Sequence, residues 1–262
     1  RLFVGSVDVY KRQTKEFDPI LMLDSFDSIN PDDYTAGFPM HPHRGIETIS
    51  YVSRGKMVHR DSLGNEAGIS DGEVQWMNSG SGIMHEEMVP AAERLLGVQL
   101  WLNLPAKDKM SKPSYNSIKN EDIKEIEIEG GKIRLLAGKY GEHEGYKGDY
   151  LSMDYYDIHL NADAEVTLTM EEDDSVMVFT LLGDVYIDGE HIEEKTAVKL
   201  TEGDSLTIKN GNEKAQVLYM NSRALNEPVA WAGPIVMNTQ EELQKAFLEL
   251  RSNTFIKETA EY

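Results

Sequence analysis

Two short motifs, well separated in the chain, carry the side chains best suited to chemistry. The first is His41-Pro42-His43, and the second is His85-Glu86-Glu87. A β-strand points alternate side chains to the same face, so His41 and His43 can share a face, and so can His85 and Glu87. If the two strands lie side by side, three imidazoles and one carboxylate converge. Such a sulfur-free ligand set suits a divalent transition metal such as iron.

Histidines also occur in turns and as hydrogen-bonded core residues, and a lone pair of this kind would leave the two interpretations evenly matched. Here two pairs with the same spacing are each flanked by glycine and by strand-like runs, which favours the metal site. The chain has 7 histidines, and three of them fall in this pattern. We expect solvated or structural roles for the isolated His143, His159 and His191.

The composition narrows the class of protein. The chain has 262 residues and no cysteine, which excludes disulfides, thiolate ligands and a cysteine nucleophile and fits a cytoplasmic location. Its net charge is −20, so its surface repels phosphates and we expect no direct nucleic-acid binding. No stretch approaches the length and apolarity of a membrane span, and we expect no membrane association.

The amino-terminal residues 1–16 do not fit the pattern of the rest. The chain starts at Arg1 rather than Met, and residues 1–13 lack the apolar core of a signal peptide. Residues 7–13 (VDVYKRQ) resemble translated sequencing-adapter sequence. We therefore interpret residues 1–16 as artefactual or truncated, and expect the fold to begin near Phe17.

The remaining chain has the pattern of an all-β protein. Apolar residues alternate with other residues along 96–104, residues 175–182 form a near-continuous apolar run, and glycine-containing turns separate the runs. Only the end is helical in pattern. Thr239 and Glu242 form a capping box, and Leu243, Ala246, Phe247 and Leu250 make one apolar stripe, which predicts a helix over about 239–251.

The two halves of the chain resemble each other weakly. Residues 55–58 (GKMV) are followed by a Gly–acid turn at Gly72, and residues 183–186 (GDVY) by a similar turn at Gly203. This pattern indicates a duplicated β-sandwich with a linker around 120–131, and hence domains at 1–120 and 121–262. At the positions that correspond to the candidate ligands, the second half has Thr169, Glu171, Gln216 and Leu218, so we expect the second domain to lack a metal.

Four segments together carry a resemblance to a known family. They are residues 38–48 (FPMHPHRGIET), 72–77 (GEVQWM), 82–88 (GIMHEEM) and 233–239 (GPIVMNT). The chain resembles the pirin family of the cupin superfamily from about Phe17 to about Phe255. The resemblance implies two tandem jelly-roll cupin domains and one mononuclear Fe(II) in the first, with Mn, Ni, Cu and Zn as alternatives.

The resemblance also implies a ligand set of His41, His43, His85 and Glu87. The general cupin pattern would instead select Glu47. Glu47 is an even number of residues from His41 and His43, so on a continuous strand it would share their face. We rank Glu87 as the ligand and give Glu47 a supporting role. We expect His59 to line or support the pocket, and Glu47, Asp61 and Gln75 are candidate acceptors for the ring N–H groups of the ligands.

Quercetin 2,3-dioxygenase activity on a flavonol-like substrate and O2 is the function that the resemblance implies, with Glu87 as the candidate catalytic base. The competing interpretation is a redox-sensitive regulatory protein that binds a transcription factor or a metabolic enzyme through a metal-dependent surface. A redox-inactive isomerase or hydrolase with Zn or Mn is a third. We expect a monomer in each case.

Overall fold

The computed structural model describes residues 14–200 and 203–258, so the adapter-like segment at 7–13 lies outside the described residues. The described chain is built of many antiparallel strands with few helical turns, which confirms the predicted all-β fold. None of the helices in the described ranges has the length and apolarity needed to span a membrane.

The chain divides into two compact units. The first unit contains residues 20–119 and 225–262, and the second contains residues 1–19 and 120–224. The predicted domains were the successive halves 1–120 and 121–262. The contacts instead group the last segment of the chain with the first unit.

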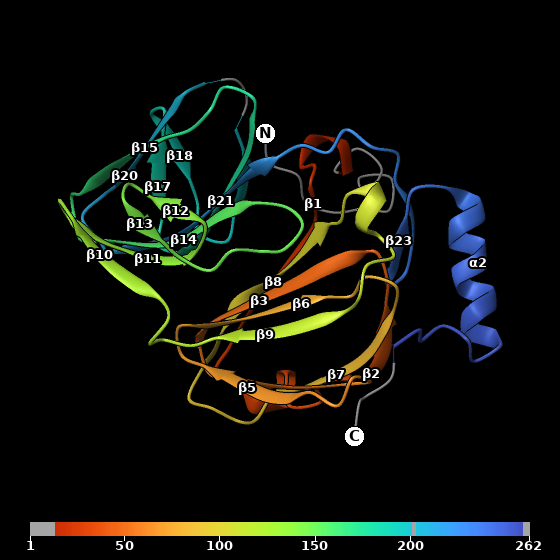
Figure 1. Cartoon of the computed structure of the whole chain (residues 1–262). Helices are drawn as coiled ribbons and strands as arrows, with labels where there is room; N and C mark the ends of the chain where they lie inside the picture. The colour runs from red at the N-terminus through yellow and green to blue at the C-terminus, as the bar shows by residue number, and fades with distance from the viewer. Residues whose placement is uncertain (1–13, 201–202, 259–262) are drawn as a thin grey trace. The chain divides into compact units, whose positions relative to one another are not determined.

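The first unit is built on two antiparallel sheets, and most of their strands are labelled in Figure 1. The five-stranded sheet has the order β1 (Ile20–Ser28), β8 (Leu95–Asn103), β3 (Ile46–Arg54), β6 (Glu73–Asn78) and β9 (Ser114–Ile118). The four-stranded sheet has the order β2 (Phe38–His43), β7 (Ile83–Met88), β4 (Lys56–Asp61) and β5 (Glu66–Ser70). The alternating run at 96–104 largely coincides with β8, at the interior of its sheet.

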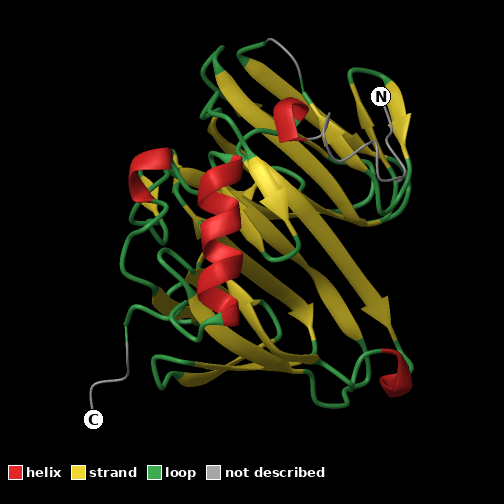
Figure 2. Ribbon diagram, turned by 90° about the vertical axis from the view of Figure 1, so that its right-hand side faces the viewer, coloured by secondary structure: helices red, strands yellow, loops and turns green. Residues whose placement is uncertain are grey.

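The last segment of the chain completes the first unit. It contains the short strands β22 (Ala230–Ala232) and β23 (Ile235–Met237) and the helix α2 (Gln240–Arg251), the longest helix in Figure 2. The predicted capping box of Thr239 and Glu242 is present, which explains why the helix begins where it does and confirms the helix expected there. The buried side chains of Leu243 and Ala246 pack with Met237.

The second unit repeats the two-sheet plan. Its six-stranded sheet has the order β10 (Lys124–Ile128), β11 (Gly131–Ala137), β14 (Met153–Leu160), β21 (Ala215–Arg223), β16 (Asp174–Leu182) and β19 (Ala197–Lys199). The four-stranded sheet has the order β15 (Glu165–Thr169), β20 (Ser205–Asn210), β17 (Val185–Ile187) and β18 (Glu190–Ile192), and β12 (Lys139–Tyr140) pairs with β13 (His143–Glu144). Inward side chains of both sheets form one large apolar core.

Candidate metal centre

Three of the predicted ligands lie together in the first unit. His41 and His43 are on β2 and His85 is on β7, and the two strands are antiparallel neighbours with His41 directly opposite His85. The Nε2 atom of His41 is 3.1 Å from Nε2 of His43 and 2.9 Å from Nε2 of His85. Within the described ranges this is the one group of side chains arranged to hold a metal ion.

The other ring nitrogen of His41 and of His43 has a backbone hydrogen-bond partner. Nδ1 of His41 is 2.8 Å from the carbonyl oxygen of Pro39, and Nδ1 of His43 is 3.0 Å from that of Pro234. Because a carbonyl can only accept, both Nδ1 atoms carry the proton and both Nε2 atoms present a lone pair. Metal-bound histidines are oriented in this way in proteins generally.

His85 is oriented through a chain of two further side chains. Nδ1 of His85 lies 3.4 Å from Nδ1 of His59, and Nε2 of His59 is 2.8 Å from the carboxylate of Asp61. With the His59 proton on Nε2, its Nδ1 accepts from His85, whose Nε2 then also presents a lone pair. The ring of His59 stacks on Tyr115, with centroids 4.0 Å apart. His59 therefore supports the centre from behind, as expected.

The electrostatics favour neutral imidazoles. Burial, followed by the nearby His41, lowers the pKa of His43 to about 3. Burial and the neighbouring histidines lower the pKa of His85 as well. Three lone pairs facing one another repel unless a cation lies between them, and neutral imidazole is the form that binds Fe, Cu, Ni and Zn. The donor set thus fits a divalent transition metal.

Glu87 lies on the same strand face as His85, but its carboxylate oxygens are not part of the group of ligand atoms formed by the three histidines. Its buried carboxylate accepts hydrogen bonds from Nε2 of Gln99, at 3.1 and 3.2 Å, and from Nε2 of Gln75. Burial raises the pKa of Glu87, and the amide hydrogen bonds oppose that shift. Its assignment as the fourth ligand stays a prediction.

Glu47 has no place in this cluster, and the spacing argument for it is wrong. The chain leaves β2 and turns at Arg44 and Gly45 before β3 begins, so the alternation does not continue from His43 to Glu47. Ser50 accepts from the two glutamines that reach Glu87, which places Ser50 on the inward face of β3. Glu47, three residues earlier, is on the opposite face.

The expected acceptors also differ from those found. Asp61 accepts from His59 rather than from a ligand, and Gln75 donates to Glu87. The acceptor for His43 is the carbonyl of Pro234, 191 residues away, which local spacing does not predict. The one signal for it in the sequence is the stretch 233–239 (GPIVMNT), which carries part of the family resemblance.

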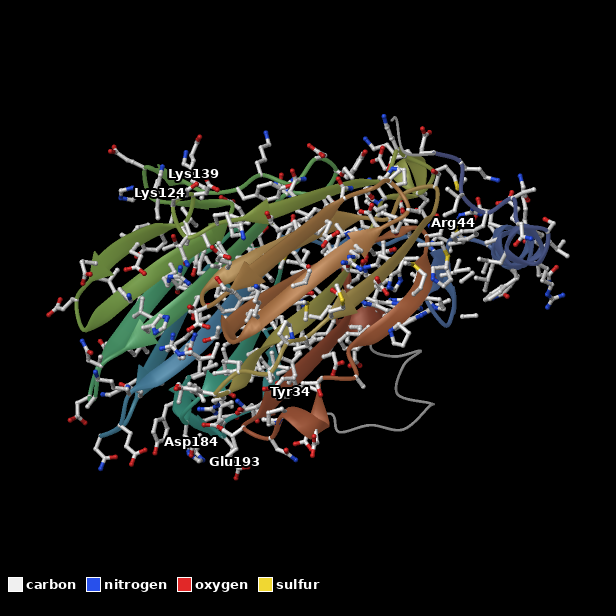
Figure 3. All side chains as sticks on the ribbon, turned by 90° about the horizontal axis from the view of Figure 1, so that it is seen from below. Tyr34, Arg44, Lys124, Lys139, Asp184 and Glu193 are labelled. Atoms are coloured by element: carbon white, nitrogen blue, oxygen red, sulfur yellow. The ribbon has the colours of Figure 1, made fainter. Side chains whose placement is uncertain are left out.

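Arg44 is buried between the turn after β2 and the last segment of the chain, and it holds the two together. Its guanidinium donates to the carbonyls of Ser81 at 2.7 Å and Phe255 at 2.9 Å, and pairs with Glu249 of α2 at 2.7 Å. It also lies 4.2 Å above the ring of Phe255. Figure 3 labels Arg44 beside the helix. These bonds fix the segment that supplies the Pro234 carbonyl.

Lys109 makes a second buried connection to the same segment. Its ammonium donates to the carbonyl of Gly45 at 2.8 Å, the side chain of Asn103 at 2.6 Å and the carbonyl of Val236 at 3.2 Å. Burial lowers the pKa of Lys109 to about 7. At Gly45 the backbone approach is so close that a Cβ atom would lie 1.9 Å from the Val236 oxygen, which explains the glycine.

Two of the isolated histidines have hydrogen-bond partners within the second unit. Nε2 of His159 is 2.8 Å from Asp157, and Nε2 of His191 is 3.0 Å from Asp184.

Comparison with known proteins agrees with this structure. The Pirin family matches residues 4–102, earlier than the expected start near Phe17, and the Pirin C-terminal cupin domain matches residues 155–256. A Pseudomonas aeruginosa protein named "Putative quercetin 2,3-dioxygenase" is 38% identical over 247 residues, covering 90% of this chain and 86% of the relative. Human pirin is 36% identical over 250 residues, covering 92% and 83%.

Among solved structures, a quercetin 2,3-dioxygenase from Acinetobacter baumannii superposes with a TM-score of 0.86 and 32% identity, covering 94% of this chain and 89% of that one. The fold is therefore a two-domain cupin with a histidine triad in one domain. The chain belongs to the pirin family.

Proposed function

We propose that the chain is a mononuclear metal-dependent dioxygenase that cleaves flavonols such as quercetin, with Fe(II) as its metal. The observation that carries the proposal is the convergence of three Nε2 atoms, each facing the others with its partner nitrogen hydrogen-bonded. The names of the Pseudomonas and Acinetobacter relatives support flavonol cleavage. The reaction consumes one O2 and opens the central flavonol ring with release of carbon monoxide.

The histidines and Glu87 have distinct roles in this proposal. His41, His43 and His85 hold the metal, and Glu87 completes the ligand set. A bound divalent metal would supply Lewis-acid polarisation of the flavonol oxygens and a route for electrons to O2. Glu87 takes the proton of the flavonol hydroxyl, and burial, which raises the pKa of its carboxyl, makes it a stronger base than an exposed carboxylate.

The surroundings of the centre suit a flat, largely apolar substrate. The side chain of Phe38, on the same edge strand as His41 and paired opposite Glu87, is 41% exposed. An exposed apolar side chain of this size next to a site favours contact with an aromatic ligand. His43 and His85 are buried, which restricts bulk water at the reacting atoms.

The test is an oxygen-electrode assay combined with loss of the flavonol absorption of quercetin. The Fe(II)-loaded protein is expected to consume O2 and to bleach quercetin, and the His85→Ala variant is expected to do neither. The His159→Ala variant, changed at a histidine of the second unit, is the matched control and should retain full activity. If Fe-, Mn-, Ni- and Cu-loaded proteins all leave a panel of flavonols unchanged, the enzyme proposal is wrong.

A regulatory role is the second candidate, and the charge of the chain favours it. The net charge of −20 suits a basic protein partner rather than nucleic acid. In this proposal a monomeric cytoplasmic protein docks onto a transcription factor or metabolic enzyme in one oxidation state of its metal. Pull-downs with the reduced and oxidised forms should then capture different amounts of partner, and equal capture would contradict the role.

A further inference from the structure

The polar side chains behind the histidines form a defined network inside the first unit. Gln75 on β6 and Gln99 on β8 both donate to the carboxylate of Glu87 on β7. The same two amides reach the hydroxyl of Ser50 on β3, at 3.2 and 3.0 Å. Side chains from four strands of both sheets therefore form one network around the Glu87 carboxylate. We call its two amide donors, Gln75 and Gln99, the glutamine clamp.

The orientation of Gln75 is set by the carboxylate. Its NH2 group faces Glu87 and Ser50, while its Oε1 atom is buried without a hydrogen-bond partner. An unpaired buried acceptor costs free energy, so the amide would turn over if no anion were held there. The clamp is thus built for an ionised carboxylate, although the hydrogen-bond donors from Gln75 and Gln99 are both neutral amides.

The Glu87 carboxylate is bound by the clamp and is not grouped with the three imidazoles. The grouped ligand atoms of the described residues are those of His41, His43 and His85, without the Glu87 carboxylate. His85 and Glu87 are nevertheless two residues apart on one strand face, about 7 Å between Cα atoms. Because the two residues are this close, a rotation of the Glu87 side chain is enough to carry its carboxylate from the clamp toward the imidazoles.

We propose that Gln75 and Gln99 form a second binding position for the Glu87 carboxylate, in competition with the metal. The centre then alternates between three and four protein ligands, and a coordination position opens for a substrate oxygen whenever Glu87 is in the clamp. Gln75 and Gln99 act as positioning residues. This inference rests on the proposed metal site. It adds that Gln75 and Gln99 control how many protein ligands the metal has.

Competition between the clamp and the metal predicts that loss of a glutamine tightens metal binding, whereas a purely structural role of the glutamines predicts that it weakens metal binding. Replacing an amide donor by leucine removes the alternative position, so Glu87 spends more time on the metal and binding tightens. Gln75→Leu and Gln99→Leu should each lower the Kd for Co(II) by about threefold to tenfold, the equivalent of one typical intramolecular hydrogen bond. If the glutamines only supported the fold, both variants would weaken Co(II) binding.

The experiment is a competitive titration of the full chain with Co(II) and a chelator, together with the visible spectrum of bound Co(II), which changes with ligand number. In the Glu87→Gln background, Gln75→Leu should have no effect on the Kd, because the competing carboxylate is gone. Gln216→Leu is the matched control, since the buried Gln216 amide donates to the buried Asp157 at 2.8 Å in the second unit. It should leave Co(II) binding unchanged.

The outcomes separate this inference from the proposed site. Unchanged or weaker Co(II) binding in both clamp variants overturns the competition while leaving the metal site in place. Failure of the wild type to bind Co(II), or equal binding by His43→Ala, overturns the metal site itself. Should Gln75→Leu not fold, Ser50→Ala loosens the same amides without removing them and should tighten Co(II) binding by a smaller factor.

Discussion

The two units share a plan of two antiparallel sheets, and they differ in what lies between the sheets. In the second unit the space is filled by apolar side chains, and the stacked rings of Tyr156 and Tyr219, 5.0 Å apart, belong to this core. In the first unit the apolar group around Val52 and Met57 occupies only part of the interior. The interior of the first unit also holds a polar group, made of the glutamine clamp, Glu87 and the histidines.

The second unit has a comparable polar cluster on the other face of its sheet. The buried carboxylate of Asp157 accepts from Gln216 and His159, both at 2.8 Å. Its neighbours Tyr156 and Ile158 belong to the core, so Asp157 points away from it. The buried carboxylate of Glu87 is bound by side chains between the two sheets of its unit, whereas that of Asp157 lies on the face turned away from the core.

The largest expected difference between the two units is that only the first binds metal. The double variant His41→Ala/His43→Ala removes two of three imidazoles and should lose bound metal completely, while the wild type holds one equivalent per chain. Metal analysis after gel filtration measures this. Two tightly held equivalents in the wild type, or one retained by the double variant, would contradict it. His159→Ala is the control and should keep one equivalent.

The first unit should depend on its last segment more than on any exposed ion pair. Arg44→Ala removes two buried hydrogen bonds donated by a charged group, and it removes the ion pair with Glu249, which keeps Lys257 at 3.1 Å. The free energy of unfolding should therefore fall by about 3–5 kcal/mol. Urea unfolding measures the change. Arg54→Ala, whose side chain is 65% exposed and pairs with Asp71 at 3.7 Å, should cost less than about 1 kcal/mol. Equal effects would mean that the segment is not held by Arg44.

The apolar interior of the second unit should support stability without affecting the metal. Ile158 is fully buried in that core, and Ile158→Ala should lower the free energy of unfolding by about 2–5 kcal/mol through the cavity it leaves. Metal content per folded chain should stay at the wild-type value. Loss of metal in this variant would show that the two interiors are not independent.

The two acidic candidates of the first unit should differ in their effect on metal binding. Glu87→Gln replaces a carboxylate near the imidazoles by a poorer ligand and should weaken metal binding about tenfold or more. Glu47→Gln changes a side chain on the opposite face of β3 and should have little effect on the Kd. Chelator competition measures both. A larger effect at Glu47 would restore the general cupin pattern.

The metal-free protein should become less stable in mild acid because of its buried imidazoles. The pKa of His43 is about 3 in the folded chain against an ordinary 6.5, so between these values only the unfolded chain binds the proton. Stability should therefore fall as pH drops below about 6.5, by about 1.4 kcal/mol per pH unit for such a histidine. Urea unfolding at several pH values measures the slope, and His43→Ala should reduce it. An identical slope in the variant would contradict the assignment.

Local patterns in the sequence predicted the all-β class, the last helix and the pairs that share a strand face. Alternation depends only on backbone geometry, so it places His41 and His43 on one face. Bringing His85 to them required the pairing of β2 with β7, which the sequence analysis assumed and the structure confirms. The capping box at Thr239 is equally local, and it correctly predicted the start of α2. The same reasoning failed for Glu47, because it counted through the turn at Gly45 as if the strand were continuous.

Packing alone decided the partners that orient the triad. The carbonyl of Pro234 reaches His43 only because Arg44 and Lys109 bind the last segment to the loop after β2, and such long-range contacts leave no periodic signal. The position of Glu87 likewise depends on two amides from separate strands. Periodicity determines which face of a strand a side chain occupies, but a hydrogen bond also needs a donor at the right distance, and only the tertiary structure brings that donor there.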